Sequence, residues 1–319
     1  MLKCAPVTEN WQSPQADETS ALPAFLTPMF KSGFVSIIGR PNSGKSTLLN
    51  HLLGEKVSIV SDKPQTTRDN ILGILSLKEG QMVFTDTPGI HKPGYELNRR
   101  MMQTVYNSLE GTDLLLLLVD ASTAFGSGDQ YVVDLVKERS LPTFLLLNKV
   151  DLVRKEALLP LIATYAGKHS FSEIIPISAL KKDNLDLLIS LILKQLPEGP
   201  PHFPEEQFTD RHERFLVGEM VREKVLLNTR DELPYSTTVQ ITRFDESQPD
   251  VVVLNCDIVV EKESQKKIVI GSQGQMLKQI GIEARADIEG LLGKRVFLEL
   301  YVRVKPKWRD DPRFLDSLR

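Results

Sequence analysis

Gly39-Arg40-Pro41-Asn42-Ser43-Gly44-Lys45-Ser46 is the stretch of sequence that decides the fold of this chain. It matches the phosphate-binding pattern G-x-x-x-x-G-K-[ST], and it lies between the apolar run Phe34–Ile38 and the helix-forming segment Thr47–Leu53. Glycines let backbone N–H groups curl around phosphate oxygens, and the following helix adds its positive N-terminal end. We therefore expect Lys45 to reach the β- and γ-phosphates of a nucleotide and the Ser46 hydroxyl to bind Mg²⁺.

Short apolar runs recur along the next part of the chain, and each is followed by a longer segment with helical spacing. The runs are Phe34–Ile38, Ile71–Leu77, Met82–Thr85, Leu114–Val119, Thr143–Leu147 and Ile174–Ile177. Continuous apolar runs are typical of strands buried on both faces, and helical segments between them indicate crossover connections. Residues 32–197 are therefore predicted to form an α/β domain of the P-loop NTPase type, with a mostly parallel sheet flanked by helices.

Two further segments suit the phosphate and metal end of such a site. Asp86-Thr87-Pro88-Gly89 directly follows an apolar run, so its carboxylate suits the Mg²⁺ shell and its Gly89 N–H is expected to meet the γ-phosphate. Thr66-Thr67-Arg68-Asp69 lies between the first helix and the second strand. We favour the Thr67 hydroxyl over that of Thr66 as the ligand that completes Mg²⁺ coordination in the triphosphate state. Loss of that ligand after hydrolysis would release the loop.

The base end of the site is predicted from Asn148-Lys149-Val150-Asp151, which follows the run Thr143–Leu147. A carboxylate at Asp151 accepts hydrogen bonds from guanine N1–H and N2–H₂, whereas adenine offers no such pair of donors. Lys149 is expected to pack its stem over the base. Ser178-Ala179-Leu180 follows the last run, and its backbone is expected to contact the guanine oxygen. An ATPase is accordingly disfavoured.

A linker and a second domain follow. The segment Pro197–Pro204 holds four prolines and a glycine, which can continue neither a helix nor a central strand, so we place a linker at 198–209. Residues 210–319 are predicted to form an α+β domain with the element order α-β-β-α-α-β. Residues 1–31 are rich in Pro, Ser, Thr, Asn and Gln and are read as a flexible tail.

The second domain contains a candidate loop for binding nucleic acid, Gly271-Ser272-Gln273-Gly274. We place it between a strand at 268–270 and a helix, where two glycines permit close approach to a phosphate backbone. Its middle residues carry no charge, so attraction of phosphate is expected from Lys278 nearby. Further candidates for RNA binding are Arg295, Lys305, Lys307, Trp308 and Arg309. For Trp308, stacking on a base and anchoring of the C-terminus are equally weighted alternatives.

Charge and composition agree with a polyanionic partner for this domain. The net charge is −3, but residues 262–309 hold eleven Lys/Arg against five Asp/Glu, so the remainder is acidic by about nine. The longest aliphatic run, Leu114–Val119, is far shorter than the roughly 20 residues of a membrane span. Cys4 and Cys256 are far apart and lack metal-ligand spacing, so we expect thiols in a reducing cytoplasm.

The nucleotide motifs, in this order, are similar to those of the Ras-like GTPase superfamily, and from about Lys31 onward the chain resembles the Era family of bacterial GTPases with a C-terminal KH domain. The resemblance rests on Gly39–Ser46, Pro64-Gln65-Thr66-Thr67-Arg68, Asp86–His91, Asn148–Asp151, Glu232-Leu233-Pro234-Tyr235-Ser236-Thr237 and Val304-Lys305-Pro306-Lys307-Trp308-Arg309. It implies a type II KH fold, binding of 16S ribosomal RNA, a role in assembly of the 30S ribosomal subunit and peripheral association with the inner membrane. We also expect a monomer.

The resemblance also bears on catalysis. Ras-type enzymes have a glutamine that orients the attacking water at the position of Ile90. The Era family shares the replacement of this glutamine. Isoleucine cannot form a hydrogen bond with water, so we expect slow intrinsic hydrolysis. Catalysis would then rest on Lys45, Thr67, Gly89 and Mg²⁺. Asn42 resembles the residue that binds K⁺ in potassium-stimulated GTPases, so K⁺ is expected to stimulate turnover.

Two functions remain open for the second domain. In the first, the GTP state controls how the domain engages ribosomal RNA, and binding should then fall steeply with salt. In the second, the domain binds a protein or an anionic membrane surface, and lipid binding should then follow the anionic fraction of the vesicles.

Overall fold

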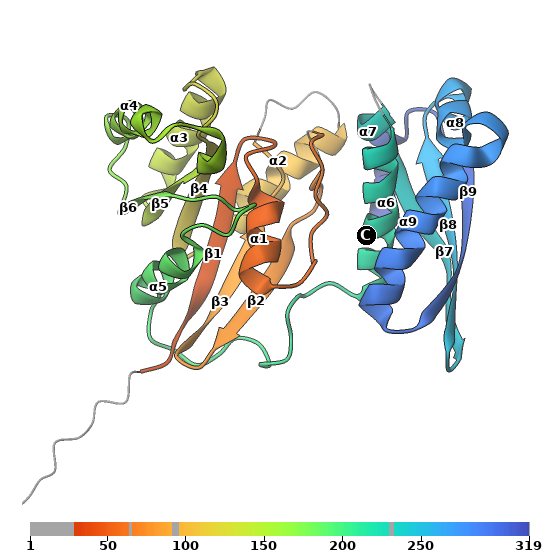
Figure 1. The fold of residues 1–319 in the computed structure, drawn as a ribbon, viewed down its shortest axis with the longest axis horizontal. Coiled ribbons are helices and arrows are strands. Elements are labelled where there is room, and N and C mark those ends of the chain that lie inside the picture. The colour runs from red at the N-terminus through yellow and green to blue at the C-terminus, as the bar shows by residue number, and fades with distance from the viewer. Residues whose placement is uncertain (1–28, 64–65, 91–95, 230–232, 319) are drawn as a thin grey trace, which may run out of the picture.

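The computed structural model of the chain describes residues 29–63, 66–90, 96–229 and 233–318. Most of the predicted tail and the positions Pro64, Gln65, His91 and Glu232 lie outside these ranges. Figure 1 shows two domains side by side, each built from a sheet and the helices that cover it. Among the described residues, no helix is long and apolar enough to cross a membrane.

The amino-terminal domain is organised around a six-stranded sheet. Its strands are β1 (Lys31–Gly39), β2 (Ile71–Leu77), β3 (Gly80–Asp86), β4 (Leu114–Asp120), β5 (Thr143–Asn148) and β6 (Glu173–Pro176), in the spatial order β2-β3-β1-β4-β5-β6. Every neighbouring pair is parallel except β2 with β3. The predicted, mostly parallel sheet is therefore confirmed. Loops that follow β1, β3 and β5 meet at one edge, as the carboxyl ends of parallel strands must.

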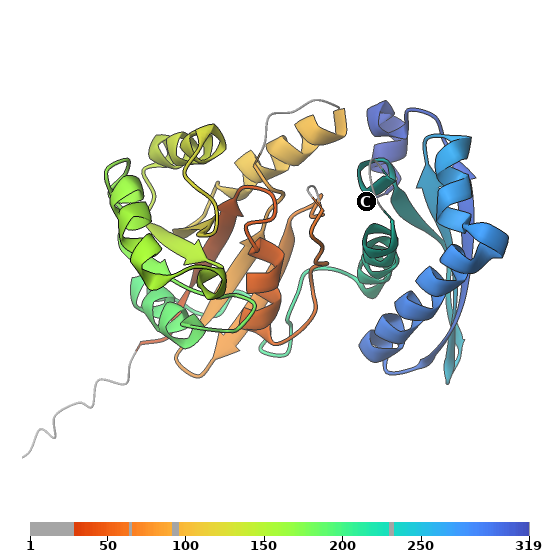
Figure 2. The same ribbon diagram turned by 45° about the horizontal axis from the view of Figure 1, so that its top comes forward.

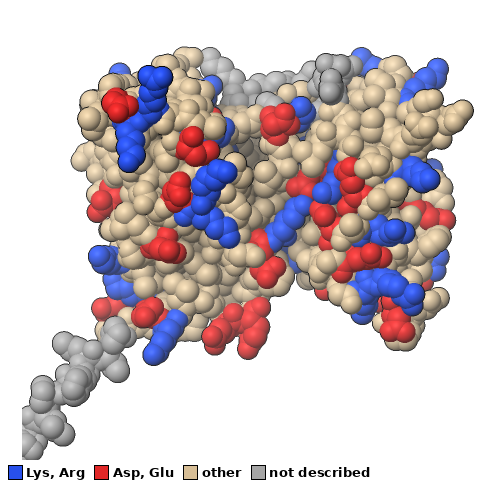
Figure 3. Space-filling model, in the orientation of Figure 1, with Lys and Arg blue, Asp and Glu red and all other residues tan. Residues whose placement is uncertain are grey.

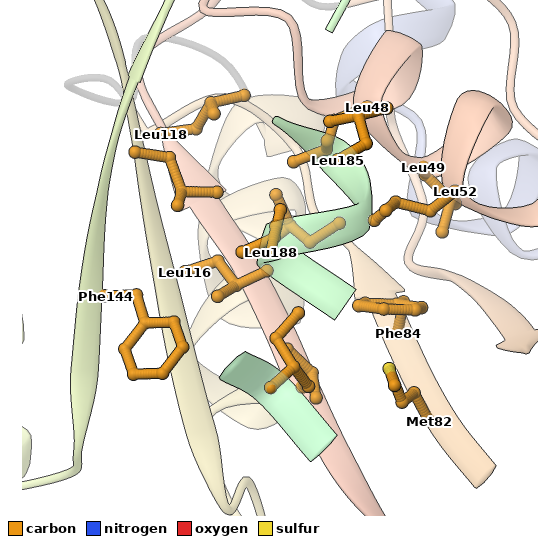
Figure 4. Close-up of a cluster of buried hydrophobic side chains, with 14 of the residues drawn as sticks. Leu48, Leu49, Leu52, Met82, Phe84, Leu116, Leu118, Phe144, Leu185 and Leu188 are labelled. Carbon is orange, nitrogen blue, oxygen red and sulfur yellow. The ribbon is translucent and has the colours of Figure 1, made fainter. Parts of the chain in front are cut away.

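Helices cover both faces of this sheet, which explains why its strands are apolar throughout. On one face, α1 (Lys45–Leu53) and α5 (Leu185–Gln195) pack Leu48, Leu52 and Leu188 against the strands, as Figure 4 shows. On the other face lie α2 (Glu96–Ser108), α3 (Ser127–Arg139) and α4 (Lys155–Ala166). This double cover holds the strand ends rigidly, so the loops at the edge have a fixed base.

The carboxy-terminal domain has one three-stranded sheet, covered by helices on one face. Its elements are α6 (Glu213–Asn228), α7 (Leu233–Ser236), β7 (Thr238–Gln248), β8 (Val251–Val260), α8 (Glu263–Ile270), α9 (Gln275–Leu292), β9 (Arg295–Val304) and α10 (Pro312–Asp316). The sheet order is β7-β8-β9, with β8 antiparallel to β7 and parallel to β9. In Figure 1, α6 and α9 lie between this sheet and the amino-terminal domain.

One sequence prediction in this domain is wrong. The run 268–270 is the end of helix α8 rather than a strand. Gln265 caps the helix, because its Oε1 accepts hydrogen bonds from the backbone N–H groups of Glu261 (2.9 Å) and Lys262 (3.0 Å). Val269 packs into the core while Ile268 remains exposed, so the short apolar run has the burial pattern of an amphipathic helix.

The segment between α5 and α6 runs along the edge of the first sheet. Its backbone N–H groups at His202 and Phe203 donate to Gln81 Oε1 (2.8 and 3.0 Å), and the Phe208 carbonyl accepts from the Ile74 N–H (3.0 Å). Proline-rich sequence and these bonds together fix the path of the chain toward α6.

Candidate functional site

The loop after β1 is shaped by close approach of neighbouring segments. Gly44 has φ of 100°, and a Cβ atom there would lie 2.3 Å from Asn148 Nδ2. The same Nδ2 donates to the Ser43 carbonyl (2.7 Å), while Asn148 Oδ1 accepts from the Ala179 N–H (2.8 Å). Asn148 therefore ties the phosphate-binding loop to the 178–180 loop, and this bracing role was not foreseen from sequence.

Lys45 lies inside this loop. Its side chain is buried, and its Nζ donates to the carbonyls of Gly39 (3.3 Å) and Arg40 (3.0 Å). Burial lowers the pKa of Lys45 to about 8, although the negative charge of Asp86 opposes the shift. The Lys45 ammonium group, buried among backbone dipoles, is placed to bind a polyanion such as the phosphates of a nucleotide.

A cavity of about 460 Å³ opens beside this loop. It is lined by nine of the predicted residues, Pro41, Asn42, Gly44, Lys45, Ser46, Thr67, Gly89, Lys149 and Leu180, together with Thr47, Thr66 and the segment 59–62. The structure thus brings residues from the predicted phosphate end and the predicted base end around one space, of a size typical of small-molecule sites. Asp86, Asn148 and Ser178 are buried beside it.

Three oxygen-bearing side chains predicted for Mg²⁺ lie together. Ser46 Oγ donates to Asp86 Oδ2 (2.7 Å), and Thr67 Oγ1 lies 2.9 Å from Ser46 Oγ and 3.4 Å from Asp86 Oδ2. Asp86 Oδ1 is buried and has no hydrogen-bond partner among the described residues. Burial raises the pKa of Asp86, while the charge of Lys45 and hydrogen bonds from the hydroxyls of Ser46, Ser58 and Thr67 oppose the shift. A cluster of hard oxygen ligands that includes one carboxylate oxygen without a hydrogen-bond partner fits a divalent cation.

The choice between Thr66 and Thr67 is supported by the same geometry. The Thr66 hydroxyl donates to the Lys63 carbonyl (2.6 Å) and lies 2.7 Å from Ser61 Oγ, so it is engaged within its own loop. Thr67 is the threonine whose hydroxyl reaches Ser46 and Asp86.

Ser58 is a member of this cluster that the sequence did not reveal. Its Oγ donates to Asp86 Oδ2 (2.8 Å), and the residue is buried. Asn50 on α1 fixes its backbone, because Asn50 Oδ1 accepts from the Ser58 N–H (3.0 Å) and Asn50 Nδ2 donates to the Ser58 carbonyl (2.7 Å). Ser58 thus bonds Oδ2 of the Asp86 carboxylate, whereas Oδ1 has no hydrogen-bond partner among the described residues.

Replacement Ser58→Ala is therefore expected to raise the Mg²⁺ concentration needed for half-maximal retention of GDP by about tenfold, since outer-shell partners orient metal ligands. Fluorescence of bound N-methylanthraniloyl-GDP during a Mg²⁺ titration measures this. Ser190→Ala, which removes an exposed hydroxyl on α5, is the matched control. An unchanged Mg²⁺ requirement in Ser58→Ala would contradict the positioning role.

The base end of the site is held by side-chain pairs. Asp151 Oδ1 accepts from Ser178 Oγ (2.6 Å), which orients the carboxylate. Lys149, at φ of 65°, forms an ion pair with Asp120 Oδ2 (2.6 Å) at the end of β4. Although burial raises the pKa of Asp120, its bonds to Lys149 and Ser122 lower it below its usual value. Asp120 was missed from sequence, where a carboxylate at a strand end was its only signal.

The residues after Asp86 pack tightly on the phosphate-binding loop. A Cβ atom on Gly89 would lie 2.7 Å from Pro41 Cα, and Thr87 Oγ1 donates to the Ile37 carbonyl (2.8 Å). The Ile90 side chain is buried in the core formed with α2 and α3, and its N–H donates to the Gly39 carbonyl (3.1 Å). Ile90 therefore offers no polar group to orient water.

Residues 56–63 and 66–68 include several that contact the carboxy-terminal domain. Arg222 on α6, almost fully buried, donates to the Thr66 carbonyl and is held by Glu219. Glu223 Oε1 accepts from the Val60 N–H (2.9 Å). Arg68 Nη1 donates to the Thr237 carbonyl (2.9 Å). Figure 3 shows cationic and anionic side chains intermixed where the two domains meet.

Trp308 belongs to this domain contact. The indole is fully buried, its Nε1 donates to the Ser236 carbonyl (2.9 Å), and the Arg68 guanidinium lies 5.5 Å from its ring centre. Leu97 and Met101 of α2 pack in the same cluster. Figure 2 shows α2 reaching toward the C-terminal segment. The structure supports the packing alternative for Trp308, since no ring face is available for a base.

Two other basic residues near the C-terminus are also held by partners. Lys305 pairs with Asp311 (2.9 Å), and Arg309 pairs with Glu261 (2.6 Å). Lys307 has φ of 55° in the turn before Trp308. Lys305, Lys307 and Arg309 are not among the residues that line the groove at the 271–274 loop.

That loop connects α8 to α9. Gly271 and Gly274 have φ of 72° and 76°, and Gln273 between them has φ of 50°. A groove of about 400 Å³ begins there and is lined by Gly274, Leu277, Lys278, Gly281, Ile282 and Arg285, and by Leu298 and Leu300 of β9. Of the predicted RNA-binding residues, Gly274 and Lys278 line it. Leu277, Ile282, Leu298 and Leu300 form its apolar wall, and none of them was singled out from the sequence as a binding residue.

Comparison with known proteins agrees with this geometry. Residues 34–149 match the family model described as 50S ribosome-binding GTPase, and residues 232–309 match the KH domain model. The GTPase Era of Syntrophus aciditrophicus is 50% identical over 288 residues, which are 90% of this chain and 94% of that protein.

Two solved structures of Era are similar over the whole described fold. Era in complex with MgGDPNP and nucleotides 1506–1542 of 16S ribosomal RNA has 43% identity and a TM-score of 0.88, covering 91% of this chain and 98% of that one. A variant of Aquifex aeolicus Era bound to GDP and AlF4⁻ has 43% identity and a TM-score of 0.87, covering 91% and 99%. The chain belongs to the Era family of GTPases.

Proposed function

We propose that this chain is a GTP-hydrolysing switch that binds 16S ribosomal RNA in the groove between α9 and β9, and that the nucleotide sets its affinity for RNA. One observation carries the coupling. The Thr66 carbonyl, adjacent to the Thr67 hydroxyl at the predicted metal site, accepts a hydrogen bond from buried Arg222 of the second domain.

The nucleotide end of the proposal rests on the cavity beside the phosphate-binding loop. Mg²⁺, when bound, neutralises phosphate charge, and Ser46, Thr67 and Asp86 are the residues that would hold it. Lys45 and the loop N–H groups would stabilise charge that develops on the phosphate oxygens. Asp151 would select guanine, and Ser178 holds its carboxylate in place. With Ile90 buried, no side chain at that position activates water, so intrinsic hydrolysis would be slow.

The RNA end rests on the groove at the 271–274 loop. Left-handed glycines let a phosphate backbone approach the N-terminus of α9, and Lys278 and Arg285 supply positive charge. Ile282, Leu298 and Leu300 provide an apolar surface for bases. A relative of known structure binds a segment of 16S ribosomal RNA, and its likeness extends over this domain.

The coupling between the two ends follows from the contacts that residues 56–63 and 66–68 make. Thr67 faces Ser46 and Asp86, whereas Thr66, Val60 and Arg68 are bonded to the second domain. Without the γ-phosphate, Thr67 would no longer be held at the metal site. Its displacement would break the contacts that Val60 and Thr66 make with α6. Ile282 of the groove is exposed in this structure. We therefore assign this arrangement of the two domains to the state that binds RNA.

The groove assignment predicts that Gly274→Asp weakens binding of single-stranded 16S ribosomal RNA by at least about tenfold, since a carboxylate would face the phosphate backbone. A Cβ atom at Gly274 meets nothing within 4 Å, and Asp tolerates its left-handed backbone, so the fold should persist. Gly271 is unsuitable, because a Cβ there would lie 2.6 Å from Met276 Cβ. Fluorescence anisotropy of labelled RNA measures the effect.

Gly274→Asn is the matched control, because asparagine has the same shape and backbone tolerance without the charge. We expect it to bind RNA more tightly than Gly274→Asp, with the difference shrinking as salt rises. Equal RNA affinity of wild type and Gly274→Asp would remove the groove from the proposal.

We also propose that K⁺ stimulates hydrolysis through Asn42. This residue has φ of 62°, lines the nucleotide cavity, and donates from Nδ2 to the Asp62 carbonyl (2.6 Å), so it connects the phosphate-binding loop to the segment before Thr66. GTP turnover in KCl is expected to exceed turnover in NaCl, and Asn42→Ala should abolish the difference. Equal turnover of the wild type in the two salts would reject a role for K⁺.

The remaining parts of the proposal concern the setting in which the switch works. Binding to 16S ribosomal RNA supports a role in assembly of the 30S subunit. Peripheral association with the inner membrane stays a prediction from family resemblance, and a monomeric state and a cytoplasmic location stay predictions from the sequence.

A further inference from the structure

The outer face of β9 carries an alternation of charged and aromatic side chains. Arg295, Phe297, Glu299, Tyr301 and Arg303 are spaced two apart, so they point to the same face of the strand. Between them, Leu298 and Leu300 point to the opposite face and line the RNA groove. One strand therefore borders the groove on one side and presents this stripe on the other.

The two aromatic residues of the stripe are unusually open to solvent. Phe297 is 55% exposed and Tyr301 is 46% exposed, although large aromatic side chains normally contribute buried area. They lie four residues apart on one strand, a separation of roughly 13 Å. Tyr301 Oη donates to Glu299 Oε2 (3.2 Å), which holds the phenol beside the carboxylate. Single exposed apolar residues are common on protein surfaces and need no explanation. Two exposed aromatic residues on the same face of one strand, with an arginine at each end, do need one.

The position of β9 connects this stripe to the groove. β9 is an edge strand, paired with β8 alone within the described sheet. In Figure 1 the sheet forms the outer layer of its domain, with α6 and α9 on the inner side. A chain that leaves the groove at Leu298 and Leu300 therefore needs to pass only the edge of one strand to reach Phe297 and Tyr301.

We propose that the outer face of β9, with Phe297 and Tyr301 as stacking platforms, is a second contact surface for single-stranded RNA that continues out of the groove. Exposed aromatics beside arginines suit unpaired bases and their phosphates, because every base has a face that can stack. Arg303 and Arg295 place guanidinium groups at the two ends of the stripe. The Arg303 side chain is 65% exposed, although its Nε pairs with the buried Asp257 carboxylate of β8. A protein partner is disfavoured, because the stripe adjoins the groove. This inference rests on the proposed RNA function.

Two RNAs of the same core sequence test the inference. One has about four nucleotides, the number that a KH groove clamps, and the other has about ten. Phe297→Ala combined with Tyr301→Ala is expected to weaken binding of the longer RNA by about tenfold for each aromatic and to leave the shorter RNA unaffected. Phe297→Leu with Tyr301→Leu, which keeps apolar area without aromatic faces, should lose nearly as much as the alanine pair.

The outcomes separate this surface from the groove. Unchanged affinity for the longer RNA in the alanine pair would overturn the platform and would favour a protein at this face. Equal weakening of both RNAs would also overturn it, because the effect would then arise in the groove. Gly274→Asp, measured beside these variants, should weaken both RNAs; if it weakens neither, the proposed groove fails independently. Tyr131→Ala, an exposed aromatic on α3, is the control that should change neither affinity.

Discussion

Replacing Asp151 with asparagine is expected to weaken binding of GTP and GDP by about a hundredfold or more. The carboxylate is an acceptor toward guanine N1–H and N2–H₂, and the amide would place a donor against a donor. Ser178 orients Asp151 through a 2.6 Å hydrogen bond, so the variant side chain should occupy the same position. Displacement of N-methylanthraniloyl-GDP measures the affinity.

Xanthine nucleotides provide the control for this prediction. Xanthine has a carbonyl where guanine has the 2-amino group, so it offers an acceptor to the new amide donor. We expect Asp151→Asn to bind xanthosine diphosphate better than GDP, which would exclude general unfolding as the cause. Undiminished GDP affinity in the variant would show that Asp151 does not read the base.

Replacing Trp308 with alanine is expected to lower the free energy of unfolding by about 3–5 kcal/mol, the cost typical of deleting a large buried aromatic. The indole is fully buried, stacks at 5.5 Å beneath the Arg68 guanidinium and donates to the Ser236 carbonyl (2.9 Å). Because Arg68 and Met101 belong to the first domain, the loss should also loosen contact between the domains. Urea denaturation followed by circular dichroism measures the stability.

Trp308→Phe separates packing from hydrogen bonding. It retains an aromatic ring but loses the indole N–H, which leaves the Ser236 carbonyl without that donor, at a cost of about 1 kcal/mol for the bond. If Trp308→Ala were as stable as the wild type, the anchoring role would be excluded and base stacking would have to be reconsidered.

Patterns that are local in sequence predicted much of this structure. The bounds of β2 coincide with the apolar run Ile71–Leu77, and those of β5 differ by one residue from the run Thr143–Leu147, because the burial of a strand shows in the polarity of consecutive residues. The phosphate-binding loop was likewise predictable, since eight adjacent residues define it. The end of α8 at 268–270 was not, because three apolar residues suit a strand and a helix equally, and the cap from Gln265 decided between them.

Contacts between distant segments account for what the sequence could not predict. Ser58 and Asp86 are 28 residues apart, and Asp120 and Lys149 are 29 apart, so no spacing rule joins them. Arg222 and Thr66 are separated by 156 residues and come from different domains. Trp308 could be assigned only from its burial. The nucleotide site was thus predictable in its motifs, whereas its supports and its link to the second domain depend on tertiary packing.

The hydrogen bond between Arg222 and the Thr66 carbonyl can be tested by comparing RNA affinity in two nucleotide states. Anisotropy titrations with 16S ribosomal RNA would use wild type and Arg222→Met, which keeps the volume of the buried side chain, each loaded with GDPNP or GDP. The wild type should bind RNA more tightly with GDPNP, and Arg222→Met should bind with nearly the same affinity in both states. An identical GDPNP-to-GDP affinity ratio in the two proteins would contradict coupling through this contact.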